Sequence, residues 1–167
     1  ERIAAEVATV AIASGAVDLA GNSDIGDSSP AFIVDTQKPT VSSATAVPSL
    51  AKAGSVAITV VFSETMNTSI LPTVQVTGLN SSPYVVTQSS FVSNTWIGTF
   101  TLVDNNEDTT ATITVVAGKD TAGNTMLANN SAGTFEVDTI EPTISDVVIT
   151  PAIIRSGETI TVLANAS

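Results

Sequence analysis

The sequence contains no cysteine and no histidine. These absences exclude a Ser-His-Asp triad, a cysteine nucleophile and the His/Cys sites that bind zinc or iron. Basic residues are also scarce, with five Lys and Arg against 16 Asp and Glu and a net charge of −11. We therefore expect no nucleic-acid partner and no binding to an anionic membrane surface.

Large rings are few as well, since aromatic residues make up 4 % of the chain, yet the mean hydropathy is +0.37. The apolar content is Ala, Val, Ile and Leu, and it is too high for a disordered acidic chain. No apolar run reaches the roughly 18–20 residues of a membrane span. The first residues, 1–3, do not open a signal peptide. We expect a folded segment without a membrane span.

An internal repeat is the most informative pattern in the chain. The motif D-x-A-G-N occurs at residues 18–22 and again at residues 120–124, which is 102 residues later. The motif V-D-T-x-x-P-T occurs at residues 34–40 and again at residues 137–143, which is 103 residues later. The chain therefore contains units of about 103 residues, with a one-residue slip in a loop.

The order of the motifs predicts where each unit begins and ends. Both motifs close one unit, and a Pro and Gly pair that also recurs opens the next. We expect residues 1–38 to be the C-terminal part of one domain, residues 39–139 a complete domain, and residues 140–167 the N-terminal part of a third. This pattern indicates a segment of a longer tandem array, although completion of the partial ends by strand donation between chains is an alternative.

The complete unit is rich in β-branched residues with partial alternation, and it shows no sustained helical periodicity. Gly, Asn, Ser, Asp and Pro separate the apolar runs. Seven strands are predicted, at residues 40–44, 56–62, 73–77, 84–87, 96–102, 111–115 and 134–137. Seven short strands in about 100 residues favour an all-β, immunoglobulin-like sandwich.

The motifs also resemble a known group of domains. D-x-A-G-N followed by F-x-V-D-T-x-x-P-T is typical of bacterial Ig-like domains in large surface proteins, and F-S-E-x-M at residues 62–66 is similar to a signature of Ig-like repeats in S-layer and other secreted proteins. The resemblance covers the complete unit and both partial ones. It implies a secreted or cell-surface location and a role in an S-layer, an adhesin stalk or a similar structure.

Alternating strands predict which loops meet at one end of the sandwich. The loops after the second, fourth and sixth strands should lie at the end that faces the preceding domain, together with the linker that enters there. We therefore expect Asp35, Glu64, Asp120 and Asn124 to converge. Carboxylate and amide oxygens are ligands of hard cations such as Ca²⁺, so the sequence predicts a junction site that Ca²⁺ could stiffen.

The repeat extends this hypothesis to three further residues. Asp138 would act for the next domain as Asp35 does here, and Asp18 and Asn22 would act for the preceding one. A second interpretation stays open, in which D-x-A-G-N builds only a turn, with Asp forming an Asx-turn and Gly or Asn adopting a positive φ. Another acidic loop, residues 104–108, is compact and rich in oxygen and could hold Ca²⁺, but it lacks the central Gly and the distal Glu of an EF-hand loop, so a solvated turn is the favoured interpretation.

The leading functional prediction is a structural spacer whose partners are neighbouring repeats of the same chain. Copies could also assemble into a lattice or filament. The alternatives are an adhesive module for cell adhesion that binds a glycan or a protein, and an accessory repeat of an extracellular enzyme. Paired carboxylates can hydrolyse glycosides, but Trp96 and Tyr84 are too few rings for a sugar platform, so we expect no enzyme activity in this segment.

Overall fold

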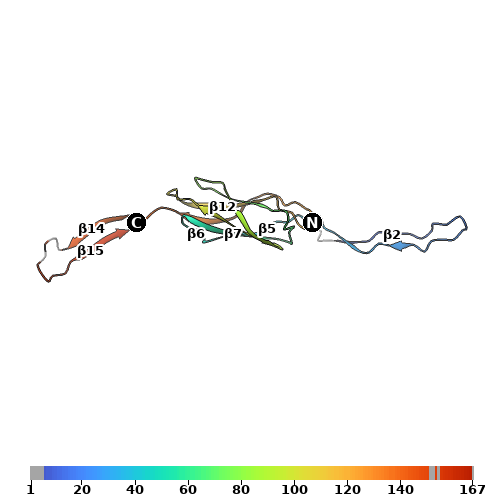
Figure 1. Cartoon of the computed structure of the whole chain (residues 1–167), viewed down its shortest axis with the longest axis horizontal. Coiled ribbons are helices and arrows are strands. Elements are labelled where there is room, and N and C mark those ends of the chain that lie inside the picture. Colours follow the sequence, from blue (N-terminus) through green and yellow to red (C-terminus); the bar gives the residue numbers. More distant parts are fainter. Residues whose placement is uncertain (1–5, 151–152, 154, 167) are drawn as a thin grey trace.

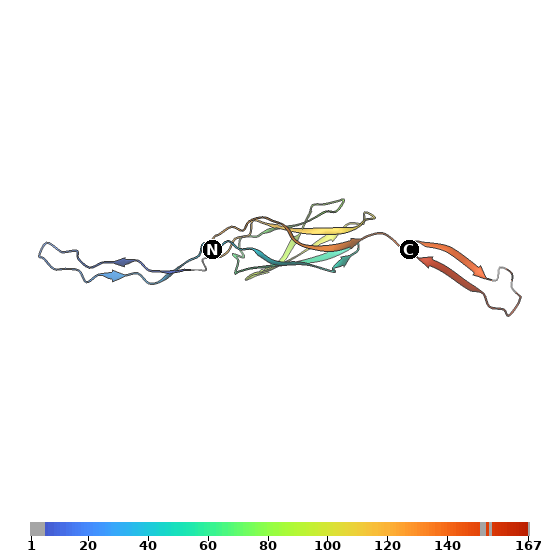
Figure 2. The same cartoon turned by 180° about the vertical axis from the view of Figure 1, so that it is seen from behind.

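The computed structural model describes residues 6–150, 153 and 155–166, and in these residues it contains strands, turns and bends but no helix. Two sheets form the centre of the molecule between residues 41 and 138, and one hairpin extends from each end of them (Figures 1 and 2). The expected all-β class is confirmed. The two central sheets share one hydrophobic core, an arrangement consistent with a β-sandwich.

The central sheets contain four and five strands. The first is antiparallel, in the order β10 (Thr87–Val92), β11 (Thr95–Leu102), β7 (Gly54–Phe62) and β5 (Val41–Val47). The second has the order β6 (Leu50–Ala51), β13 (Asn129–Asp138), β12 (Asp108–Val116), β8 (Thr73–Thr77) and β9 (Tyr84–Val85), in which only β6 pairs in parallel.

Alternating burial explains why these segments form half-buried strands. In β7 every second side chain from Val56 to Phe62 is buried, and in β12 the same holds from Ala111 to Val115. Successive side chains of a strand point to opposite faces, so one face of each sheet supplies the core. Trp96 is 1 % exposed within this core.

The strand count differs from the prediction. Residues 41–138 form nine strands rather than seven. The predicted strand at residues 84–87 is split between β9 and the start of β10, with the buried Val86 between them. The rest of β10 and the two-residue β6 were missed, because Ser and Gln dominate the first and the second is too short to show a periodic pattern.

The two hairpins expose much apolar surface. In the N-terminal one, β1 (Glu6–Ala8) pairs with β4 (Phe32–Val34) and β2 (Ala11–Ile12) pairs with β3 (Asp27–Ser28). In the C-terminal one, β14 (Ile144–Thr150) pairs with β15 (Thr161–Ala166). At the repeat spacing they correspond to β12 with β13 and to β5 with β7. The division into one complete and two partial domains stays a prediction.

Candidate metal centre

Three segments that are distant in sequence meet at the end of the sheets next to the N-terminal hairpin. Asp35 follows β4, Glu64 follows β7, and Asp120 follows β12. The ends of β7 and β12 lie beside the start of β5, because β7 pairs antiparallel with β5 and an isolated bridge joins Met66 to Asp120. The topology therefore places all three acidic residues around the linker, as the sequence predicts.

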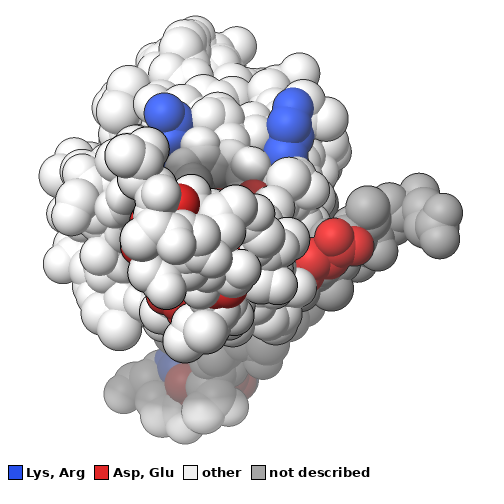
Figure 3. All heavy atoms as spheres, turned by 90° about the vertical axis from the view of Figure 1, so that its right-hand side faces the viewer, with Lys and Arg blue, Asp and Glu red and all other residues white. Residues whose placement is uncertain are grey.

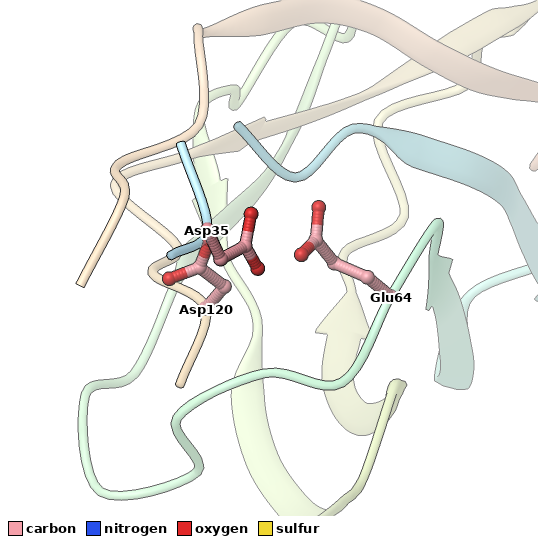
Figure 4. A group of neighbouring side chains, drawn as sticks. All are labelled: Asp35, Glu64 and Asp120. Carbon is pink, nitrogen blue, oxygen red and sulfur yellow. The ribbon is translucent and has the colours of Figure 1, made fainter. Parts of the chain in front are cut away.

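The three carboxylates face one another (Figure 4). One oxygen atom from each of Asp35, Glu64 and Asp120 lies within 4.8 Å of the other two. Asp120 is 1 % exposed, whereas Asp35 and Glu64 are partly buried. No other group of three or more acidic side chains is this close within the described part of the chain.

A tight turn fixes the position of Asp120. Its Oδ1 accepts hydrogen bonds from the backbone N–H of Gly123 at 2.6 Å and of Asn124 at 2.8 Å. The Asn124 side-chain Nδ2 donates to Asp120 Oδ2 at 2.8 Å and to the backbone carbonyl of Asp35 at 3.0 Å. Gly123 has φ +98°, which a residue with a side chain rarely adopts. Asn124 thus joins the turn to the linker through its amide nitrogen.

The same turn forms in the N-terminal hairpin, where the other acidic residues of the site have no counterpart. Asp18 Oδ1 accepts from the N–H of Ala20 and Asn22, and Asn22 Nδ2 donates to Asp18 Oδ2 at 2.8 Å. Both Asp18 and Asn22 are exposed. The turn interpretation of D-x-A-G-N is therefore correct for its local geometry, and in the complete unit this geometry also places a carboxylate in the cluster.

Asp138 repeats the local structure of Asp35 at the opposite end of the sheets. Asp35 Oδ1 accepts from the N–H of Gln37 at 2.9 Å, and Asp138 Oδ1 accepts from the N–H of Ile140 at 3.0 Å. Asp138, Asp18 and Asn22 lie outside the three-carboxylate cluster. Their predicted ligand roles concern neighbouring domains and stay predictions.

Glu64 is the least satisfied member of the cluster. Its Oε1 is buried and has no hydrogen-bond partner. Burial, together with the Asp120 and Asp35 carboxylates, raises the pKa of Glu64 above its ordinary value. An unpaired buried oxygen and like charges both destabilise the ionised form. A cation between the three carboxylates would remove both costs.

The donor set consists only of oxygen atoms, so the cluster could hold a metal ion of the hard class. Hard cations such as Ca²⁺ and Mg²⁺ bind carboxylate oxygens, with backbone carbonyls and water completing the shell. Three carboxylates alone do not select between these ions. Calcium therefore belongs to the proposal below.

The acidic loop at residues 104–108 is a turn at the far end of the sheets. Asp104 Oδ1 accepts from the N–H of Asn106 at 3.2 Å. Glu107 departs from the expected solvated turn, because it is 8 % exposed. Its Oε2 accepts a hydrogen bond from the N–H of Asn80 at 3.0 Å. The alternation of β12 could have revealed this, because extending it back from Ala111 points residue 107 inward.

Comparison with known proteins gives no relatives: no family model, no curated protein and no solved structure matches the chain. Among the described residues, no helix is long and apolar enough to cross a membrane.

Proposed function

We propose that this chain is a structural segment of tandem Ig-like repeats in a secreted or cell-surface protein, and that Ca²⁺ stiffens the junction between successive repeats. The observation that carries the proposal is the convergence of Asp35, Glu64 and Asp120. One residue comes from the linker and two come from loops of the following unit. An ion held by all three would tie the linker to that unit.

The strand order supports the Ig-like part of the proposal. In Ig-like sandwiches the first, second, fourth and fifth strands form one sheet, and the third, sixth and seventh form the other. Strands β5, β7, β10 and β11 would be the first set, and β8, β12 and β13 the second. The short strands β6 and β9 would be additions at the edges of the second sheet.

Calcium is the preferred cation because the cluster combines rigid and adjustable ligands. Asp120 is held by three hydrogen bonds within its turn. Glu64 has no hydrogen bond to hold its buried Oε1, so its carboxylate can adjust to an ion. Ca²⁺ accepts six to eight oxygens in flexible geometry, whereas Mg²⁺ demands a near-ideal octahedron at about 2.0–2.1 Å.

A scattering experiment on the full chain tests the junction. With Ca²⁺ we expect a narrow distribution of particle lengths, and with EGTA a broader and shorter one, because the linker regains freedom. Asp120→Ala should show the broad distribution in both buffers. Asp18→Ala is the matched control, since it breaks the same turn at a position outside the cluster. Curves that are identical with Ca²⁺ and with EGTA would contradict the proposal.

A further inference from the structure

Each hairpin is joined to the central sheets by a short linker. The hairpins lie beyond the ends of the sheets rather than against their faces (Figures 1 and 2). Charged side chains are sparse on the surface that faces the viewer along the long axis (Figure 3), and exposed ion pairs contribute little in any case. The direction of each hairpin therefore depends on how its linker is attached.

The linker after β13 is attached to the central sheets through Thr139. This residue is 6 % exposed and directly follows Asp138, the last residue of β13. Its backbone N–H donates to the carbonyl oxygen of Glu107 at 2.8 Å, and its Oγ1 accepts from the N–H of Glu107 at 2.9 Å. The Thr139 side chain thus takes the place of a backbone acceptor and extends the pairing between β12 and β13 into the linker.

Glu107, the partner of Thr139, is itself held by the loop between β8 and β9. Its Oε2 accepts from the N–H of Asn80 at 3.0 Å. Two residues before it, Asn105 Nδ2 donates to Ser81 Oγ in the same loop at 2.8 Å. Thr139 is therefore bonded to a residue that the central sheets already restrain, and these bonds need no cation.

The residue before Thr139 is directed differently. Asp138 is exposed, and its Oδ1 accepts from the N–H of Ile140 within the linker itself. Its backbone pairs with Asp108 at the end of the ladder, but its side chain lies outside the core. The carboxylate of Asp138 is thus available to whatever follows the linker.

The N-terminal linker shows the other half of this arrangement. There Asp35 lies with the carboxylates of Glu64 and Asp120, which belong to the unit that the linker enters, whereas Thr36 is exposed. At the repeat spacing, the position that corresponds to Glu107 is residue 4, which lies outside the described residues. Residues 34–40 and 137–143 share the motif V-D-T-x-x-P-T, so each linker displays one of the two contacts that the motif can make.

We propose that the Asp-Thr pair of this motif attaches each linker on both sides. Thr holds the linker to the unit that it leaves, without a cation, and Asp holds it to the unit that it enters, with the help of one. The two side chains are adjacent in sequence, so no unattached residue lies between the two contacts. The inference rests on the repeat units proposed above and adds a cation-independent half to each junction.

Distances between spin labels test the Thr139 contact in the full chain, which has no native cysteine. Labels at Thr101→Cys and Thr161→Cys report on the C-terminal hairpin, and labels at Thr101→Cys and Thr9→Cys report on the N-terminal one. All three positions are exposed. Thr139→Val should widen the distance distribution to the C-terminal hairpin about twofold, because the N–H of Glu107 loses its acceptor. The widening should be the same with Ca²⁺ and with EGTA.

Two further variants serve as controls. Thr139→Ser keeps the hydroxyl and should retain the narrow distribution. Thr134→Val makes the same chemical change at an exposed position of β13 and should leave both distributions unchanged.

An unchanged distribution in Thr139→Val would overturn the proposal, and so would widening that occurs only in EGTA. Equal widening for both hairpins would also overturn it, because the fold rather than the linker would then have loosened. The cation proposal is judged separately by the N-terminal pair of labels in the parent chain. If EGTA leaves that distribution unchanged, the cation account fails and the Thr139 result is unaffected.

Discussion

The side-chain amide of Asn124 donates a hydrogen bond to the backbone carbonyl of Asp35, across 89 residues of sequence and 3.0 Å of space. This bond joins the linker to the turn that holds Asp120. It requires no ion, so the junction has a polar attachment before any cation binds. The three carboxylates next to it oppose that attachment through their mutual repulsion. We expect the balance between these two effects to set the stiffness of the linker.

Asn124→Ala should loosen the linker. It removes the bond to Asp35 and one bond to Asp120, and a lost hydrogen bond costs about 0.5–1.5 kcal/mol. Hydrogen exchange at the Gln37 amide, which donates to Asp35, should accelerate. Asn22→Ala is the matched control, because Asn22 makes the equivalent bond to Asp18 and is not bonded to the Asp35 linker. Equal exchange at Gln37 in both variants would show that Asn124 does not restrain the linker.

Glu64→Gln should stabilise the protein in EGTA. The Glu64 carboxylate has a buried oxygen without a partner and faces two like charges. Removing its charge should raise the Tm by roughly 2–5 °C. The same variant should lose most of the stabilisation that Ca²⁺ gives. With Ca²⁺ the parent should therefore have the higher Tm, whereas in EGTA the variant has it. A variant less stable than the parent in EGTA would show that Glu64 has a stabilising partner.

The stability of the ion-free protein should depend on pH through Glu64. Its pKa is raised in the folded state, so the folded protein binds more protons than the unfolded chain between the ordinary and the raised pKa. Its contribution to stability therefore falls as the pH rises through that interval. In urea unfolding with EGTA, the free energy of unfolding should fall less for Glu64→Gln than for the parent protein over the same pH interval. Parallel pH profiles of the two proteins would contradict this assignment.

Gly133→Ala should destabilise the central sheets. The new Cβ would overlap the backbone oxygen of Ala44 in β5. Overpacking of this kind costs about 1–3 kcal/mol. Ala132→Gly in the same strand is a useful comparison, because it loosens the backbone without adding an atom. Thermal unfolding measures both changes, and an unaffected Gly133→Ala would show that the two strands can separate without cost.

The sequence was sufficient to predict the end of the sheets at which the acidic residues meet. Alternating strands place the loops after β7 and β12 at one end, whatever the details of packing, so the strand pattern alone groups Asp35, Glu64 and Asp120. The strand at Thr73–Thr77 was also predicted to the residue, because Val74 and Val76 alternate with polar neighbours.

Other features depend on three-dimensional packing and could not be predicted in this way. Strand β10 has only Phe91 buried, so its sequence resembles a loop, and it forms because β11 offers a partner. The amide of Asn124 was expected to contribute oxygen to a cation, but its nitrogen faces Asp35 and Asp120. Side-chain orientation at a junction depends on a linker whose path the strand pattern does not specify.

The most direct test of the cation account is a calorimetric titration of the full chain with Ca²⁺. We expect one site per chain that Glu64→Gln abolishes and Asp18→Ala retains. At a hundredfold excess over the Kd, binding should stabilise the fold by about 2.7 kcal/mol, which corresponds to a Tm increase on the order of 10 °C. A titration without binding heat, together with an unchanged Tm, would contradict the account.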